Sequence, residues 1–205
     1  MLERAARLLS DTEHARFERQ APDLRRRRTV LRAALRIALA RWLGRAPETF
    51  RFVAEPAGKP RLDGEDAHFS VSSSGEYGLI ALTALGPVGV DIERVRPIDE
   101  LDAVALRSFR ADAAREVIDE PAQRKAEVFY RHWTMLEAQL KASGVGLAQR
   151  LDCLGGEADR RAWTVTAVDP GPGYAGAIAV RGSHDLSARA LYPQVLDLNA
   201  ELACA

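Results

Sequence analysis

The chain has 205 residues, of which 47% are hydrophobic and 28% charged, a composition typical of a soluble globular protein. Its 29 basic residues balance its 29 acidic ones, which excludes a net field that would steer it toward nucleic acid or a membrane surface. Cys153 and Cys204 lack metal-ligand spacing and suit a reducing compartment. No apolar run approaches the roughly 20 residues of a membrane span, and the N-terminus lacks signal-peptide features. We therefore expect a cytoplasmic protein without a membrane partner.

The N-terminal part of the chain is predicted to be helical. Residues 9–20 read as a short helix with Ser10 as N-cap and Glu13 three positions later, the spacing of a capping box. Residues 23–44 read as a longer helix, because leucines and alanines recur at helical spacing and Gly44 is a natural stop.

A run of four arginines, Arg25 to Arg28, falls on this longer helix. Four adjacent side chains cannot share one helix face, so we expect most of them to be solvated. Arg28 lies three residues before Leu31 and seven before Leu35, which predicts that it faces inward. An inward arginine needs an anion. A protein carboxylate and a ligand phosphate are the two candidates.

The remaining predicted elements alternate between strands and helices. They are an alternating stretch and turn at 49–62, two strands within 67–85 around a turn at 72–78, a strand at 87–97, helical segments at 101–120 and 123–144, and a hairpin at 162–182. This order predicts an α+β chain of two comparable halves with a seam near Pro87, residues 1–87 and 88–205.

Two carboxylates lie on the predicted strand at 87–97. Asp91 and Glu93 are two positions apart, so they point to one face and lie about 7 Å from each other along the strand. They repel unless a positive charge lies between them. One interpretation is a solvent-facing strand edge, with the side chains of Arg94 and Arg96 nearby. The other is a site for a hard cation with oxygen ligands, Mg²⁺ above all.

Glu137 and Lys141 lie one turn apart on the helix at 123–144, in line with Trp133. An exposed ion pair at this spacing contributes only about 0.2–0.5 kcal/mol and is an adequate explanation by itself. Placed beside Asp91 and Glu93, however, Glu137 would be a third oxygen ligand and Lys141 would meet a phosphate. A metal, a lysine and a carboxylate together are the groups that a phosphoryl-type displacement uses.

Two short motifs and the histidines are weaker signals. The turn "GKP" contains Lys59, and "SSSG" begins with Ser72. As phosphate-binding elements these would offer backbone N–H groups and hydroxyls, but such sequences are common in ordinary turns. The histidines show no catalytic pattern, and His132 is interpreted as a partly buried polar residue.

Taken in order, the motifs resemble those of the surfactin-type 4′-phosphopantetheinyl transferases. They are "GKP", "HFSVSSSGEYGLIAL", "VGVDIERVRP" and "FYRHWTMLEAQLKASGVGL". The resemblance implies a Mg²⁺-dependent enzyme that moves the 4′-phosphopantetheine arm of coenzyme A to a serine of an acyl or peptidyl carrier protein. It also implies a pseudo-dimer of two similar α/β halves with the active site at their interface.

The resemblance further implies a role for each matching residue. Asp91, Glu93 and Glu137 would hold Mg²⁺ on the pyrophosphate. Glu137 would also be the base toward the carrier serine, and Lys141 would stabilise the charge that develops on the pyrophosphate. Arg28 would bind the 3′-phosphate of coenzyme A.

Lys59, Ser72 and Ser73 would line the same coenzyme A pocket. Ser73 stands where the family has a histidine, so it offers a hydrogen bond without a charge. A charge-assisted bond contributes about 1.5–3 kcal/mol, so the affinity for coenzyme A is expected to fall on the order of ten- to a hundredfold. Leu136 stands where the family has a lysine, and it extends the apolar stripe of its helix.

Two other functions are compatible with these motifs beside transfer of the arm. One is a repurposed homologue that binds a carrier-tethered arm or an acyl coenzyme A and catalyses condensation or cyclisation. The other is a carrier-protein binder without catalysis. The sequence does not identify the carrier or the pathway, and it predicts a monomer because the two halves supply their own interface.

Overall fold

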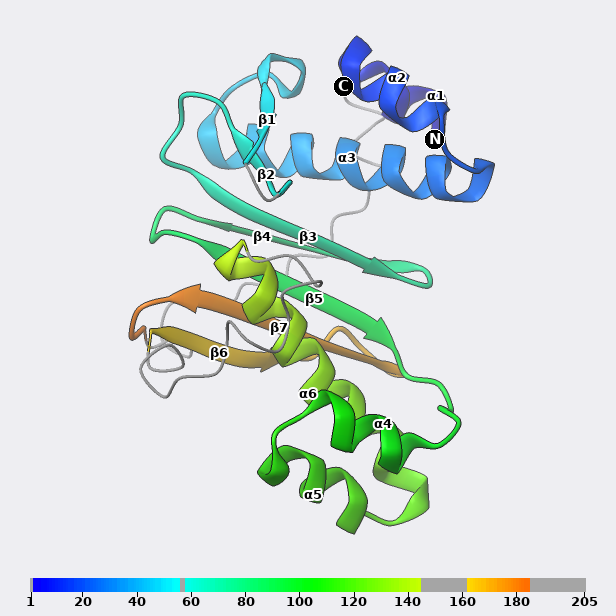
Figure 1. Ribbon diagram of the computed structural model, residues 1–205. Coiled ribbons are helices and arrows are strands. Elements are labelled where there is room, and N and C mark those ends of the chain that lie inside the picture. Colours follow the sequence, from blue (N-terminus) through cyan, green and yellow to red (C-terminus); the bar gives the residue numbers. More distant parts are fainter. Residues whose placement is uncertain (1, 56–57, 145–161, 185–205) are drawn as a thin grey trace. The chain divides into compact units, whose positions relative to one another are not determined.

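The computed structural model describes residues 2–55, 58–144 and 162–184 (Figure 1). Their contacts group them into two compact units, one with residues 2–53 and 62–65 and one with residues 54–61 and 66–184. The chain combines helices with antiparallel strands, which confirms the α+β prediction. The boundary at Pro87 between two similar halves stays a prediction, because contacts measure packing and not internal similarity.

The first unit is mainly helical. It contains α1 (Leu2–Arg7), α2 (Asp11–Glu18), α3 (Pro22–Leu43) and the 3₁₀ helix η1 (Pro47–Thr49). The predicted capping box is confirmed, because Ser10 N donates to Glu13 Oε2 at 2.9 Å and Glu13 N donates to Ser10 Oγ at 3.4 Å. The predicted stop is confirmed as well, since α3 ends at Gly44 in the left-handed region with φ of 66°.

The strands in the described part of the chain form three small sheets. β1 (Phe52–Ala54) pairs with β2 (Pro60–Leu62), β3 (His68–Ser74) pairs with β4 (Tyr77–Thr83), and the third sheet has the order β5 (Val88–Arg94), β7 (Tyr174–Arg181), β6 (Trp163–Val168). The pairs β3–β4, β5–β7 and β6–β7 are antiparallel. The predicted hairpin at the end of the described residues is thus confirmed as β6 and β7.

The turn predicted at residues 72–78 is too long. β3 continues to Ser74, which pairs directly with Tyr77 at the start of β4, so only two residues remain in the turn. Two-residue hairpin loops need positive φ angles, and Gly75 supplies one at 57°. The serines that suggested a loop therefore lie on a strand, where alternate side chains share a face.

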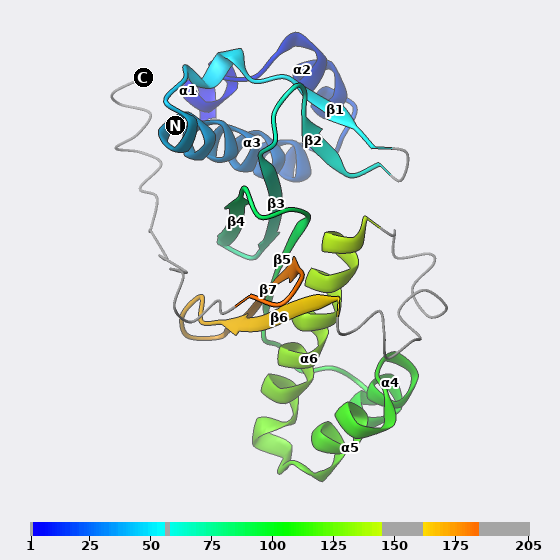
Figure 2. The ribbon, with the colours of Figure 1, turned by 90° about the vertical axis from the view of Figure 1, so that its left-hand side faces the viewer.

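Three helices lie in the described residues between β5 and β6. They are α4 (Leu101–Ser108), α5 (Ala111–Asp119) and α6 (Ala122–Ser143). The helical segment predicted at 101–120 is broken at Phe109, whose backbone is extended, and the Phe109 ring packs 5.1 Å from that of Phe129. Figure 2 shows α4 and α5 beside one end of α6.

The helix α6 lies against the three-stranded sheet (Figure 1). Small side chains form this contact, in a buried cluster of Ala138, Ala142, Ala177 and Ala179. Small residues let a helix backbone approach a sheet closely, so the side chains that α6 carries beside this seam can reach β5. No helix in the described part of the chain is long and apolar enough to cross a membrane.

Candidate functional site

The two carboxylates of β5 both face β3. Ser72 Oγ donates to Asp91 Oδ1 at 2.8 Å, and Ser74 Oγ donates to Glu93 Oε2 at 2.8 Å. The prediction that the two acids share one face of the strand is confirmed. The solvent-facing interpretation is wrong for Asp91, which is only 3% exposed, because β3 packs beside β5 on this side.

A positive charge does lie against the carboxylate of Asp91. Lys141 Nζ donates to Asp91 Oδ1 at 2.6 Å and to Ser72 Oγ at 2.9 Å. The second oxygen, Asp91 Oδ2, is buried and has no hydrogen-bond partner among the described residues. The Lys141 side chain is 33% exposed, so one end of this buried ion pair is open to solvent.

Glu137 lies one turn before Lys141 on α6 and is 6% exposed. The exposed ion-pair interpretation of these two residues is therefore wrong. The physical reason is tertiary: this side of α6 packs on β5 and is removed from water. Lys141 is salt-bridged to Asp91 on β5, and the buried carboxylate of Glu137 is costly unless its charge is compensated.

Gly89 explains how α6 comes so close to β5. A Cβ at this position would overlap the Ala138 carbonyl oxygen and the Ala142 amide nitrogen, so any larger residue forces the helix away. Gly89 is not among the residues predicted to form the site. Its signal was available, because an isolated glycine inside a strand pattern often marks a close backbone approach.

The carboxylates of Asp91 and Glu93 are ligands of the kind that a hard cation prefers. Carboxylate oxygens are the ligands that Mg²⁺ prefers, and Asp91 Oδ2 is a buried oxygen whose hydrogen-bonding capacity is unused by the described residues. Within the same residues, however, no three acidic, histidine or cysteine side chains are gathered closely enough to hold a metal ion. The three-ligand set of Asp91, Glu93 and Glu137 therefore stays a prediction.

Lys59 is held by two backbone carbonyls. Its Nζ donates to Val88 O at 2.8 Å and to Ala142 O at 3.4 Å, so it joins the start of β5 to the last turn of α6. A cation at a helix C-terminus is favourable because the final carbonyls carry partial negative charge. Burial lowers the pKa of the Lys59 ammonium, and the Glu55 carboxylate opposes that shift.

The remaining predicted positions of this unit have simple environments. Ser73 is exposed on the face of β3 opposite to Ser72, and Leu136 is partly buried on α6. His132 is partly buried, with Nε2 2.9 Å from Glu116 Oε2, as its interpretation as a polar packing residue expected. The segment after Gly144, which completes the "SGVGL" motif, lies outside the described residues.

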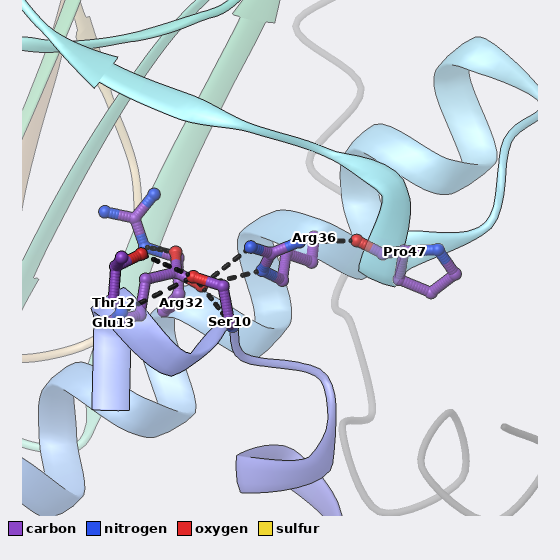
Figure 3. Close-up of polar contacts among 6 residues, drawn as sticks. All are labelled: Ser10, Thr12, Glu13, Arg32, Arg36 and Pro47. Carbon is purple, nitrogen blue, oxygen red and sulfur yellow. Dashed lines mark hydrogen bonds and ion pairs between the residues drawn. The ribbon is translucent and has the colours of Figure 1, made fainter. Parts of the chain in front are cut away.

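The prediction that Arg28 faces inward is wrong, because the side chain is exposed. Burial on α3 begins only at Thr29, since the buried cluster with α1 and α2 involves its later turns. The buried arginine is Arg36, which donates from Nε and Nη2 to Glu13 Oε2 at 3.2 and 2.7 Å (Figure 3). A protein carboxylate is thus the anion of the inward arginine. The role of Arg28 toward a phosphate stays a prediction.

Residues 87–185, which run from the start of β5 past the end of β7, match the family model of the 4′-phosphopantetheinyl transferase superfamily. This segment contains Asp91, Glu93, Glu137 and Lys141. The match confirms the resemblance to that superfamily that the motifs predicted.

Several curated proteins are similar to this chain. The protein slr0495 of Synechocystis sp. is 38% identical over 149 residues, which cover 71% of this chain and 61% of that protein. The 4′-phosphopantetheinyl transferase HetI of Nostoc sp. is 36% identical over 153 residues, covering 72% of this chain and 65% of HetI. The 4′-phosphopantetheinyl transferase Sfp of Bacillus subtilis is 34% identical over 103 residues, covering 50% of this chain and 45% of Sfp. In each case the match spans less than two thirds of the relative.

Proposed function

We propose that this chain transfers the 4′-phosphopantetheine arm from coenzyme A to a serine of an acyl or peptidyl carrier protein, with Mg²⁺ as cofactor. The observation that carries the proposal is the ion pair between Lys141 and the buried Asp91, because both residues lie in the segment that matches the superfamily. The relatives HetI and Sfp bear the name of this activity.

In this proposal Asp91, Glu93 and Glu137 would hold Mg²⁺ against the pyrophosphate of coenzyme A. When bound, the ion would neutralise charge that develops on the leaving phosphate. The oxygen donors would be Oδ2 of Asp91, which has no hydrogen-bond partner among the described residues, and the carboxylates of Glu93 and Glu137. Glu137 would also take the proton of the carrier serine, directly or through water.

Lys141 would act on the pyrophosphate. Its ammonium donates to Asp91 and Ser72, yet the side chain is 33% exposed, so it can exchange a protein oxygen for a phosphate oxygen. A lysine directed at a phosphate stabilises the negative charge of an in-line displacement more than that of the ground state. Transfer then releases 3′,5′-ADP.

Coenzyme A is proposed to bind in a pocket formed by two similar halves of the chain. The residues proposed to contact it are Arg28, Lys59, Ser72 and Ser73. Two of these groups already have protein partners: Lys59 donates to backbone carbonyls, and Ser72 donates to Asp91. Ser73 is exposed and uncharged. Weak binding of coenzyme A is therefore expected.

The test is incubation of the protein with coenzyme A, Mg²⁺ and apo carrier proteins of the fatty acid, polyketide and nonribosomal peptide types. We expect one carrier serine to gain the mass of the arm. Lys141→Met should reduce kcat by on the order of a hundredfold or more, as loss of one charge-stabilising group does. No mass gain with any carrier at high coenzyme A concentration would sink the proposal.

A further inference from the structure

Three serines on one face of β3 connect this strand to β5. Ser70, Ser72 and Ser74 alternate along β3, so their side chains point the same way. β3 and β5 belong to different sheets, and they pack side by side in the second unit. Val90 N donates to Ser70 Oγ at 3.1 Å, and Arg94 N donates to Ser74 Oγ at 3.0 Å. The hydroxyls of Ser70 and Ser74 thus accept backbone N–H groups of β5.

The hydrogen-bond directions at Ser74 follow from its atoms. A serine hydroxyl has one proton to donate and two lone pairs to accept. Because the backbone N–H of Arg94 can only donate, Ser74 Oγ accepts that bond. Its single proton is then directed to Glu93 Oε2 at 2.8 Å. The backbone of β5 therefore orients the hydroxyl that in turn holds a carboxylate of the same strand.

We propose that Ser74 is a positioning residue for Glu93: it fixes one carboxylate oxygen and so presents the other, Oε1, to a divalent cation. The inference rests on the proposed function only in taking Glu93 as a ligand. Glutamate has several rotatable bonds and loses more freedom than aspartate when it binds, so a ligand held in place in advance binds its ion more tightly. Ser72 likewise donates to one oxygen of Asp91, although its own hydroxyl accepts from Lys141 Nζ and not from the backbone of β5 in the contacts described.

Ser70 is a matched control for Ser74. Both serines lie on the same face of β3, and both accept a backbone N–H of β5 at nearly equal distances of 3.1 and 3.0 Å. Only Ser74 also donates to a carboxylate. A purely structural role would make Ser70→Ala and Ser74→Ala equivalent, whereas a positioning role separates them. Ser74→Thr keeps the hydroxyl and tests for rescue.

The experiment is calorimetric titration of the full chain and its variants with Mg²⁺, and with Mn²⁺ as a second probe, followed by the Mg²⁺ dependence of transfer. Loss of a residue that orients a metal ligand typically weakens metal affinity by about 10- to 100-fold, and we expect Ser74→Ala to raise the Kd for Mg²⁺ by about tenfold. Ser70→Ala should leave the Kd within about twofold of the unsubstituted chain, and Ser74→Thr should restore most of the affinity.

Each outcome decides the inference. Equal Mg²⁺ affinities of the Ser70→Ala and Ser74→Ala proteins would overturn it, and so would a chain that transfers the arm with an Mg²⁺ requirement unaffected by Ser74→Ala. A chain that transfers to no carrier, yet loses Mg²⁺ affinity with Ser74→Ala alone, would support the inference while sinking the proposed function. Thermal unfolding of each variant identifies any that does not fold, and Ser74→Thr then carries the comparison.

Discussion

Two buried carboxylates, one in each unit, have opposite charge surroundings. Glu13 of the first unit lies between two guanidinium groups, with Arg32 Nε 3.2 Å from Oε1 and Arg36 Nη2 2.7 Å from Oε2. Arg36 is 1% exposed and also donates to Pro47 O (Figure 3). Burial lowers the pKa of Arg32, and Glu13 opposes that shift. Here one acid is paired with two bases, and each of the three side chains is at most 13% exposed.

The second unit reverses this balance. Asp91 pairs with Lys141, which is one third exposed, and Glu93 lies on the same face of β5. A closed cluster with excess positive charge fixes helices to one another. A cluster with excess negative charge and a partly exposed lysine can instead exchange partners and attract a further cation. The comparison teaches that charge balance and exposure, more than burial of a carboxylate, separate a structural ion pair from a candidate site.

The largest effect is expected from Gly89→Ala, which should destroy the second cluster without touching its charges. The added Cβ would overlap backbone atoms of Ala138 and Ala142, which cannot rotate away, so we expect the second unit not to fold cooperatively. Gly171→Ala is the control, since Gly171 has φ of 113° but open space around its Cβ position. Thermal unfolding should show a far smaller loss for that variant, and an unaltered Gly89→Ala protein would refute the close-approach argument.

The next largest effect is expected in the first cluster. Glu13→Gln leaves Arg36 buried without its counter-ion, and removing one partner of a buried pair costs about 3–5 kcal/mol. Denaturant titration measures this loss of unfolding free energy. Glu120→Gln breaks the exposed pair with Arg124 and should cost at most about 0.5 kcal/mol. Similar losses for the two variants would show that the Glu13 cluster does not hold the helices together.

Mg²⁺ should stabilise the second cluster and leave the first unaffected. A ligand that binds only the folded state stabilises it by about 2.7 kcal/mol at a hundred times its Kd. We expect Asp91→Asn to abolish this gain in denaturant titration. Asp102→Asn, which removes a half-exposed carboxylate paired with Lys125, should keep it. A gain retained by Asp91→Asn would contradict the assignment of Asp91 as a ligand.

The smallest effect is expected at Lys59. Burial lowers the pKa of its ammonium below the ordinary value of 10.5. Between its lowered folded-state pKa and 10.5, the unfolded chain binds a proton that the folded chain has released. The contribution of Lys59 to stability therefore rises with pH across that window. Measured against Lys59→Met, the free energy of unfolding of the unsubstituted chain should increase as pH approaches 10.5 from below. A difference that falls with pH would show that the charged form is the favoured one in the fold.

Much of the fold could be predicted from local patterns. The capping box at Ser10, the stop at Gly44 and the hairpin of β6 and β7 depend on neighbouring residues, and all three are confirmed. The turn after Ser74 was placed too early because consecutive serines favour loops, while pairing with β4 extends the strand. The single helix predicted at 101–120 is instead two helices. Between them lies Phe109, which is extended and packs against Phe129, a contact that local sequence patterns do not reveal.

The sequence by itself determined the family, the shared face of Asp91 and Glu93, and the helical spacing of Glu137 and Lys141, because all of these follow from motif order and backbone periodicity. Only the tertiary structure decided which charges meet. It placed Lys141 on Asp91, exposed Arg28, and buried Arg36 instead. The physical reason is that periodicity gives a side chain its direction along one element, whereas its burial and its partner depend on which element packs against that face.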